Sequence, residues 1–294
     1  MPTAGKRLLL ALLALLLLAG ASSCSYLDRK EGEWIFRPAS GDYFGNRAVN
    51  ANFQEHWIPV GKEGEKLHAW WSPVADANAP VLLYLHGARW SLSGSASRIP
   101  RWNQMGFSVL AIDYRGFGKS SPRSPSEQSA NEDSEAAWDY LGHLAPGARR
   151  YLFGHSLGGA MATHLALLHP EAAGLILEAT FTNIPELVRY YPWGVLPVGP
   201  LITQRFDNLD RIAQVKVPIL FAHGTSDTTV PFAMSEQLFR AAQASKRLFK
   251  AEGASHHNVA ASQYDGYRQA VNEFFGLPAH SIAAQSNATS TGTR

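Results

Sequence analysis

Between about residues 34 and 276, short apolar runs alternate with segments in which apolar residues recur at helical spacing. This alternation predicts an α/β domain with a mostly parallel central sheet flanked by helices. Four predicted strands are almost wholly apolar, as strands covered by helices on both faces must be; they occupy residues 81–85, 108–112, 150–153 and 174–177. Further strands are predicted at 55–60, 67–72, 219–222 and 247–250, and helices at 97–105, 127–144, 158–169, 231–244 and 262–275.

Residues 184–209 interrupt this pattern with four prolines and a cluster of aromatic residues. So proline-rich a segment does not form a single helix, because proline lacks the amide hydrogen and clashes with the preceding turn. We expect a short cap over the open edge of the domain. In that case Tyr190, Tyr191 and Trp193, with Trp90, suggest an apolar acyl-binding pocket. An irregular connection carrying ordinary core aromatics is the alternative.

The two ends of the chain differ from this domain. Residues 8–19 form an apolar run after Lys6 and Arg7. The run is shorter than the roughly 20 residues of a spanning helix, so it predicts a secretory signal peptide over residues 1–23. A linker (24–33) and a disordered tail (277–294) are predicted to flank the domain.

The signal peptide is followed by a sequence that resembles the cleavage box of bacterial lipoproteins, in which small residues precede a cysteine that becomes acylated. Here the box reads Gly-Ala-Ser-Ser-Cys and ends at Cys24. The resemblance implies lipidation of Cys24, export to the bacterial cell envelope and a membrane anchor. Position −3 is Ala21, where that family usually has leucine, and cleavage by an ordinary signal peptidase is the alternative.

The composition of the chain argues against several classes of partner and site. The 26 Lys and Arg nearly balance the 24 Asp and Glu, which argues against a nucleic-acid partner. A single cysteine rules out an internal disulfide and a cysteine-based zinc site. The 11 histidines include no H-E-x-x-H pattern, so we expect no metal and no cofactor. Oligomeric state is left open.

A nucleophile motif stands between a predicted strand and a predicted helix. Residues 154–158 read G-H-S-L-G, which is G-x-S-x-G in the strand, tight turn and helix context that gives this motif its meaning. The chain here resembles the α/β-hydrolase superfamily, over about residues 34–276, in the short-capped branch that includes monoglyceride lipases and serine-aminopeptidase-like esterases. The resemblance implies an α/β-hydrolase fold and Ser156 as nucleophile.

In that superfamily an acid and then a histidine follow the serine along the chain. Asp227 is the candidate acid, because an apolar strand delivers it in a short polar loop; a helix cap near Pro231 is the alternative. The base lies in a loop that contains two adjacent histidines, His256 and His257. The family spacing selects His256, with His257 as the alternative.

The turn after the strand at 81–85 reads H-G-A-R and resembles the family's H-G-x turn. This implies the amides of Ala88 and Leu157 as the oxyanion hole, with His86 as a structural residue. Residues 113–120 also match a family loop, in which we expect Asp113 and Arg115 to form local ion pairs without a catalytic role.

The predicted activity is that of a serine hydrolase, which forms an acyl-enzyme from an ester, a thioester or, less readily, an amide. Its partner is a small acyl ester, and membrane attachment would place it near lipid esters. Two alternatives stay open. An aminopeptidase or amidase would use an acidic residue such as Glu178 to bind a substrate amine; a local hydrogen-bonding role for Glu178 is the alternative. A non-catalytic binding protein would keep the fold alone.

Overall fold

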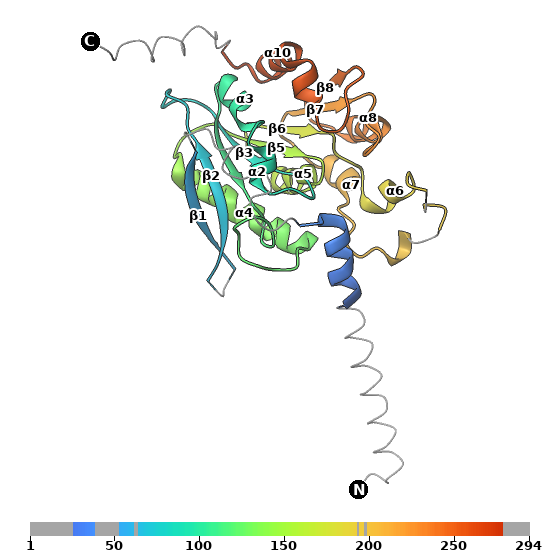
Figure 1. Cartoon of the computed structure of the whole chain (residues 1–294). Helices are drawn as coiled ribbons and strands as arrows, with labels where there is room; N and C mark the ends of the chain where they lie inside the picture. The colour runs from blue at the N-terminus through green and yellow to red at the C-terminus, as the bar shows by residue number, and fades with distance from the viewer. Residues whose placement is uncertain (1–25, 39–52, 62–63, 193, 197–198, 279–294) are drawn as a thin grey trace, which may run out of the picture.

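The computed structural model describes residues 26–38, 53–61, 64–192, 194–196 and 199–278 (Figure 1). Within them lies one eight-stranded sheet of order β1-β2-β4-β3-β5-β6-β7-β8. Antiparallel pairing joins β1 to β2 and β2 to β4, and parallel pairing joins the other neighbours. This confirms the predicted fold class. The strands are β1 (Gln54–Val60), β2 (Glu65–Ser72), β3 (Val81–Leu85), β4 (Ser108–Ile112), β5 (Arg150–His155), β6 (Gly174–Glu178), β7 (Ile219–Gly224) and β8 (Lys246–Ala251).

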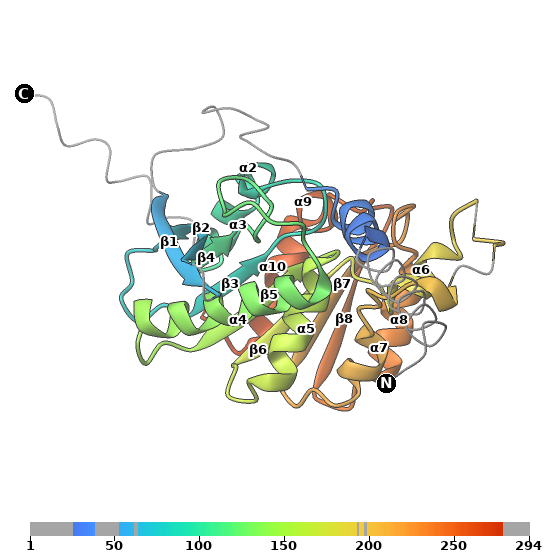
Figure 2. The same cartoon turned by 90° about the horizontal axis from the view of Figure 1, so that it is seen from below.

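Helices cover both faces of the sheet and enclose two hydrophobic cores (Figure 2). One face is covered by α4 (Glu127–Leu144), α5 (Gly158–Leu168), α7 (Asn208–Ile212) and α8 (Phe232–Ala241). The other is covered by α2 (Leu92–Ser95), α3 (Ile99–Gln104), α9 (Val259–Ser262) and α10 (Tyr264–Phe275). β3, β4 and β6 are buried along their whole length and are almost wholly apolar, apart from Ser108 at the start of β4 and Glu178 at the end of β6, which made them recognisable in the sequence.

Two predicted helices are confirmed, and each is preceded in the structure by a short helix that was not predicted. The predicted helix at 97–105 is α3, which has a proline in its first turn and follows the separate short helix α2. The predicted helix at 262–275 is α10, which follows the short helix α9. The spacing of apolar residues gives little information about such single turns, or about where a helix begins.

The predicted linker at 24–33 is wrong over its described part, because residues 26–36 are helical. The end of this helix is buried in the domain: the Phe36 ring lies 6.3 Å from that of Phe117 and 5.8 Å from that of Phe206. The sequence appeared to be a linker because charged residues dominate its first half. Its apolar residues become informative only when their partners, far along the chain, are known.

The predicted cap at 184–209 contains one short helix, α6 (Ile184–Val188), and a 3-10 turn, Gly199–Leu201. It lies beside helix 26–36 (Figure 1). The carboxylate of Glu31 joins the two, since it accepts hydrogen bonds from the backbone amides of Thr203 (3.1 Å) and Gln204 (2.9 Å).

The predicted signal peptide and Cys24 lie outside the described residues. So does the predicted tail except for residues 277–278, where Leu277 is buried against the core rather than part of a disordered segment. Among the helices that the structure describes, none combines the length and the apolar composition that crossing a bilayer requires.

Candidate active site

The candidate nucleophile, Ser156, stands in the sharp turn between β5 and α5. Its φ is 54°, a left-handed conformation that non-glycine residues adopt rarely and mostly where function requires it. Glycines at 154 and 158 make this turn possible: a Cβ at Gly154 would overlap the Gly158 carbonyl oxygen, and one at Gly158 would overlap the Leu85 carbonyl oxygen. The turn therefore presents the serine hydroxyl at the carboxyl edge of the sheet.

The structure brings Ser156, His256 and Asp227 into one hydrogen-bonded chain. His256 Nε2 lies 3.0 Å from Ser156 Oγ, and His256 Nδ1 lies 2.7 Å from Asp227 Oδ2. Asp227 follows β7 and His256 follows β8, so both loops open at the edge where β5 ends. The Asp227 carboxylate accepts a hydrogen bond from Nδ1–H and so favours the tautomer in which Nε2 is unprotonated and able to take the serine proton.

Asp227 is held in its ionised form. Burial alone would raise the pKa of this carboxyl, but hydrogen bonds from His223 and His256 lower it below its usual range. The other carboxylate oxygen, Oδ1, accepts hydrogen bonds from the backbone amides of Thr229 (2.8 Å) and Val230 (2.9 Å). A permanently charged carboxylate can stabilise the imidazolium that forms when His256 takes up a proton.

His257, the alternative base, lies beside the His256 ring (centroids 4.8 Å apart), but the hydrogen bonds that link Ser156 and Asp227 are made by His256. The His257 ring centroid lies 4.8 Å from that of Trp90, and the residue is exposed. Burial of part of the ring, with repulsion from His256 and Arg98, lowers the pKa of His257 to about 4. The ring is therefore neutral at pH 7, and the geometry places His256 in the base position.

A buried ion pair lies behind the two histidines. Arg98 donates to the Glu178 carboxylate (2.8 Å) and to the backbone carbonyl of His257 (2.7 Å). Glu178 is therefore neutralised within the fold and does not face a substrate amine, which removes the sequence-based support for an aminopeptidase. No motif pointed to Arg98, because its partners lie 80 and 159 positions away.

The amides of Ala88 and Leu157 both lie at the wall of the cavity that contains Ser156. Neither donates a hydrogen bond to an acceptor within the described part of the chain. His86 does not reach the serine; its Nδ1 donates to the Gly87 carbonyl (2.6 Å), and burial lowers its pKa. The arrangement leaves two N–H donors available for an oxyanion.

The residues of the 113–120 loop hold the scaffold together. Asp113 accepts a hydrogen bond from the Leu92 amide at 2.7 Å. Arg115 is fully buried and ion-paired with three carboxylates, those of Glu65, Glu132 and Asp133. These partners belong to the scaffold and not to the hydrogen-bonded chain at the nucleophile, in keeping with the expected structural role.

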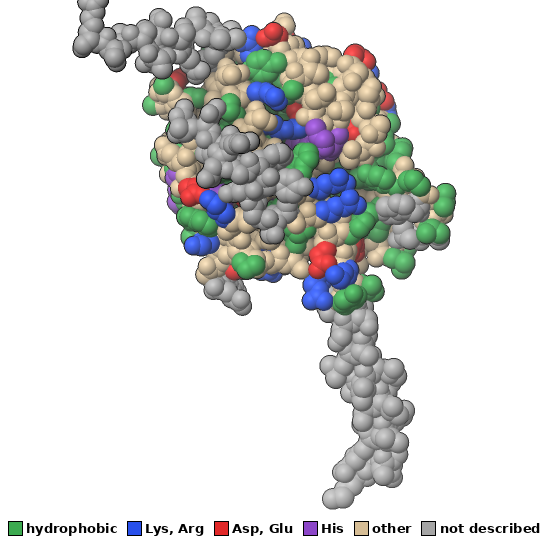
Figure 3. All heavy atoms as spheres, viewed as in Figure 1, with side chains coloured by type: hydrophobic (Ala, Val, Ile, Leu, Met, Phe, Trp, Pro, Cys, Tyr) green, Lys and Arg blue, Asp and Glu red, His purple; other side chains and the backbone are tan. Residues whose placement is uncertain are grey.

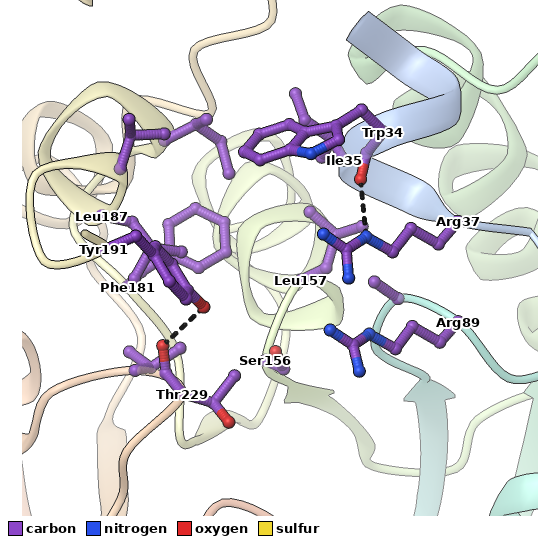
Figure 4. A pocket seen from close by; sticks show the side chains of 14 residues that line it. Trp34, Ile35, Arg37, Arg89, Ser156, Leu157, Phe181, Leu187, Tyr191 and Thr229 are labelled. Carbon is purple, nitrogen blue, oxygen red and sulfur yellow. Dashed lines mark hydrogen bonds between the residues drawn. The ribbon is translucent and has the colours of Figure 1, made fainter. Parts of the chain in front are cut away.

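Two cavities meet at Ser156. The larger, of about 260 Å³, is mostly apolar (Figure 4) and is lined by Trp34, Ile35, Arg37, Ala88, Arg89, Ser156, Leu157, Phe181, Ile184, Leu187, Val188, Tyr191, Thr229 and Val230. The smaller is about 90 Å³ and includes Trp90, Arg98 and the histidines. Of the predicted pocket aromatics, Tyr191 lines the larger cavity, Trp90 lines the smaller, Tyr190 lines neither, and Trp193 lies outside the described residues.

Helix 26–36 and the residues after it contribute part of the larger cavity, which sequence reasoning missed. A signal was present: Leu27, Trp34 and Ile35 stand at positions i, i+7 and i+8, a spacing typical of one helix face. The segment is short and highly charged, so this signal was weak.

Three imidazoles, those of His155, His256 and His257, could in principle hold a metal, because their nitrogens lie within 4.8 Å of one another. Both nitrogens of His256 are already engaged, with Asp227 and with Ser156. His155 lies behind the site with Nε2 donating to the His256 carbonyl (3.0 Å), and burial lowers its pKa well below the usual range. A metal here would have to break the hydrogen-bonded chain.

Comparison with known proteins finds hydrolases among the proteins that this chain is similar to. The family model described as serine aminopeptidase, S33, matches residues 76–210. An uncharacterized protein of Mycobacterium tuberculosis is 31% identical over 260 residues, which cover 85% of this chain and 88% of that protein. A lysophosphatidylserine lipase of Gallus gallus is 30% identical over 240 residues, covering 72% of this chain and 62% of the lipase.

Among solved structures, an esterase of Pyrococcus furiosus superposes with a TM-score of 0.65 at 18% identity, covering 81% of this chain and 97% of the esterase. Est1E of Butyrivibrio proteoclasticus, with ferulic acid bound, superposes with a TM-score of 0.63 at 19% identity, covering 75% and 99%. At these identities the likeness is one of fold.

Proposed function

Because this chain belongs to the α/β-hydrolase superfamily and is a hydrolase, we propose that it cleaves carboxylic esters with Ser156 as nucleophile, through an acyl-enzyme intermediate. The observation that carries the proposal is the hydrogen-bonded chain from Asp227 through His256 to Ser156, which ends at the wall of an apolar cavity. A serine hydroxyl is a weak nucleophile at neutral pH unless a base removes its proton, and this chain provides that base.

The reaction proceeds in two halves. Ser156 Oγ attacks the ester carbonyl carbon while His256 Nε2 takes the hydroxyl proton, and the amides of Ala88 and Leu157 bind the resulting oxyanion. When the intermediate collapses, His256 returns the proton to the departing alkoxide, which leaves as an alcohol. A water molecule, deprotonated by His256, then attacks the acyl-enzyme, and the carboxylic acid leaves as Ser156 regains its proton.

The cavity favours a substrate with an apolar acyl chain. Its wall beside Ser156 is formed by side chains such as Phe181, Leu187 and Tyr191, all from the cap or the segment that leads to it. The relatives named as lysophosphatidylserine lipases support an ester rather than an amide. Thioesters share the required carbonyl chemistry.

Chain-length dependence tests the pocket. With full-length protein purified in detergent, we expect kcat/KM on p-nitrophenyl octanoate to exceed that on p-nitrophenyl acetate by about 10-fold or more, since each buried methylene contributes about 0.8 kcal/mol to binding. The expected ratio of kcat/KM is smaller than burial of all the added methylene groups would give, because the end of the octanoyl chain need not be completely buried. A preference for acetate would contradict an acyl-binding role for the cavity.

We further propose that the protein is exported and held at a membrane of the cell envelope through a lipid on Cys24. The proposal rests on the sequence of residues 1–24 and on an exposed apolar surface to which the first described residues, from Tyr26 on, contribute. Most of the exposed large apolar side chains of the described residues belong to helix 26–36 and the cap, and Figure 3 shows such side chains gathered there: Tyr26, Leu27, Trp34, Tyr190, Val195, Leu196 and Leu201.

Acylation is directly measurable. In a bacterial host fed radiolabelled palmitate, the wild-type chain is expected to incorporate label and to sediment with membranes, and Cys24→Ser is expected to do neither. The thioether-linked and amide-linked chains supply enough buried methylene groups for stable attachment. Wild-type protein that carries no label and is released into the soluble fraction would instead indicate ordinary signal-peptide cleavage.

A further inference from the structure

Two arginine side chains, those of Arg37 and Arg89, line the larger cavity on the side opposite its apolar wall (Figure 4). Leu187, Tyr191 and Phe181 lie on one side of the view and the two guanidinium groups on the other, with Ser156 between them. A molecule bound over Ser156 therefore meets an apolar surface at one end and two positive charges at the other.

The backbone holds these two side chains next to each other. The amide of Arg89 donates to the carbonyl of Phe36 (2.8 Å), the residue before Arg37. Both arginines have left-handed backbones, with φ of 47° at Arg37 and 80° at Arg89. Such conformations are unfavourable for non-glycine residues and persist where the surrounding structure imposes them, often at ligand-binding sites.

Arg37 is also oriented within its own segment. Its Nε donates to the Trp34 carbonyl (3.1 Å), and the guanidinium carbon lies 5.8 Å from the Trp34 ring centroid. These contacts leave the terminal nitrogens of the guanidinium group for another acceptor. A guanidinium fixed in this way loses less conformational entropy when it binds an anion.

Neither Arg37 nor Arg89 forms an ion pair with a carboxylate of the described residues, unlike Arg98 in the smaller cavity and Arg115 in the scaffold. Arg98 is paired with Glu178 at 2.8 Å, and Arg115 is paired with three carboxylates. The charge of Arg89 extends into the site, because it contributes to lowering the pKa of His257. Figure 3 shows basic side chains beside a histidine on this face. Two adjacent uncompensated cations repel each other, and an anion bound between them relieves that repulsion.

We propose that Arg37 and Arg89 form a subsite for the anionic group, a phosphate or a carboxylate, of an amphiphilic ester whose acyl chain occupies the apolar side of the same cavity. The subsite rests on the proposed ester hydrolysis and narrows its substrate class to single-chain esters with a negatively charged head. Guanidinium groups suit both anions, because their paired N–H donors match two oxygens at once.

Matched substrates test the subsite. Using full-length protein in detergent, kcat/KM is measured on three esters with the same acyl chain: 1-acylglycerol, 1-acylglycerol 3-phosphate and 3-acylglycerate. The first is neutral, the second carries a phosphate and the third a carboxylate. Comparing the second with the third shows which of the two anionic groups the subsite prefers. The quantity compared is the ratio of kcat/KM for each anionic ester to that for the neutral one.

We expect a ratio above about 10 in the wild type for at least one anionic ester, and a fall of about 10- to 100-fold in Arg37→Gln/Arg89→Gln, mainly through KM, because charge-assisted hydrogen bonds are lost. The matched control Arg240→Gln, an exposed arginine of α8, keeps the wild-type ratio. Lysine at both positions retains part of the preference, and added salt reduces it. A wild-type ratio near one, or a double variant that keeps the preference, would overturn the proposal.

A binding measurement separates this inference from the proposed function. In the Ser156→Ala background, 1-acylglycerol 3-phosphate is titrated below its micelle concentration, with tryptophan fluorescence as the readout because Trp34 adjoins Arg37. The subsite predicts saturable binding that weakens about 10-fold or more when both arginines become glutamine. If the wild type hydrolyses no ester but this binding persists, the proposed activity fails and the subsite stands. Equal binding with and without the arginines overturns the subsite whatever the activity.

Discussion

Replacing Ser156 by alanine is expected to lower kcat on a p-nitrophenyl ester by about 10⁶-fold, with little change in KM. The hydroxyl is the atom that forms the acyl-enzyme bond, and it lies 3.0 Å from His256 Nε2. Without it, only water held over the oxyanion donors can attack the ester, and such residual catalysis is small. The measurement is steady-state hydrolysis, supported by labelling of the active serine with a fluorophosphonate probe.

The same variant gives a control for the fold. The alanine side chain is smaller than that of serine and would occupy the same left-handed position, so the midpoint of thermal unfolding should stay close to that of the wild type. A stable variant that still reacts with the fluorophosphonate, or that retains more than about a thousandth of the wild-type rate, would place the nucleophile elsewhere and exclude the proposed mechanism.

Alanine in place of His256 is expected to lower kcat by a similar factor, about 10⁶-fold, because the serine then lacks a base and the leaving alkoxide lacks an acid. His257→Ala is the matched control, since it removes an imidazole at the next position of the same loop. Asp227 and Ser156 are hydrogen-bonded to His256 and not to His257, so we expect a change in kcat of less than about 10-fold. Both variants are compared on one ester and by fluorophosphonate labelling.

The pH profile adds a second comparison between the two histidines. Since the pKa of His257 is about 4, its ring is already neutral at every pH from about 5 to 8, and removing it leaves the charge of the site unchanged over that range. The acid limb of kcat/KM should therefore be the same in His257→Ala and in the wild type. Loss of activity in His257→Ala, with activity retained in His256→Ala, would show that the base has been assigned to the wrong residue.

Much of the fold was predictable because its signals are local. Strands covered by helices on both faces are almost wholly apolar, and β3, β4 and β6 carry that pattern in their own residues. The tight turn at Ser156 likewise needs glycine at two flanking positions, because any larger residue would overlap the backbone. Because such a motif consists of consecutive residues, it can be recognised in the sequence before the fold is known.

Helix 26–36 and the pairing of Glu178 were not predictable in this way. The helix becomes part of the domain because Phe36 packs against Phe117 and Phe206, which lie far along the chain. The sequence leaves Glu178 open to binding an amine or to a local hydrogen bond, and the structure places Arg98 against it. In both cases the function of a residue depends on a partner that its own neighbourhood does not specify.

By itself, the sequence determined the fold class, the candidate nucleophile and the order in which an acid and a histidine follow it. Only the tertiary structure decided which of two adjacent histidines faces Ser156, and that Arg37 and Arg89 share one cavity with it. The physical reason is that backbone conformation and burial leave a pattern in neighbouring residues. The direction of a loop side chain, and the charges that surround it, are set by contacts between segments that only the folded chain brings together.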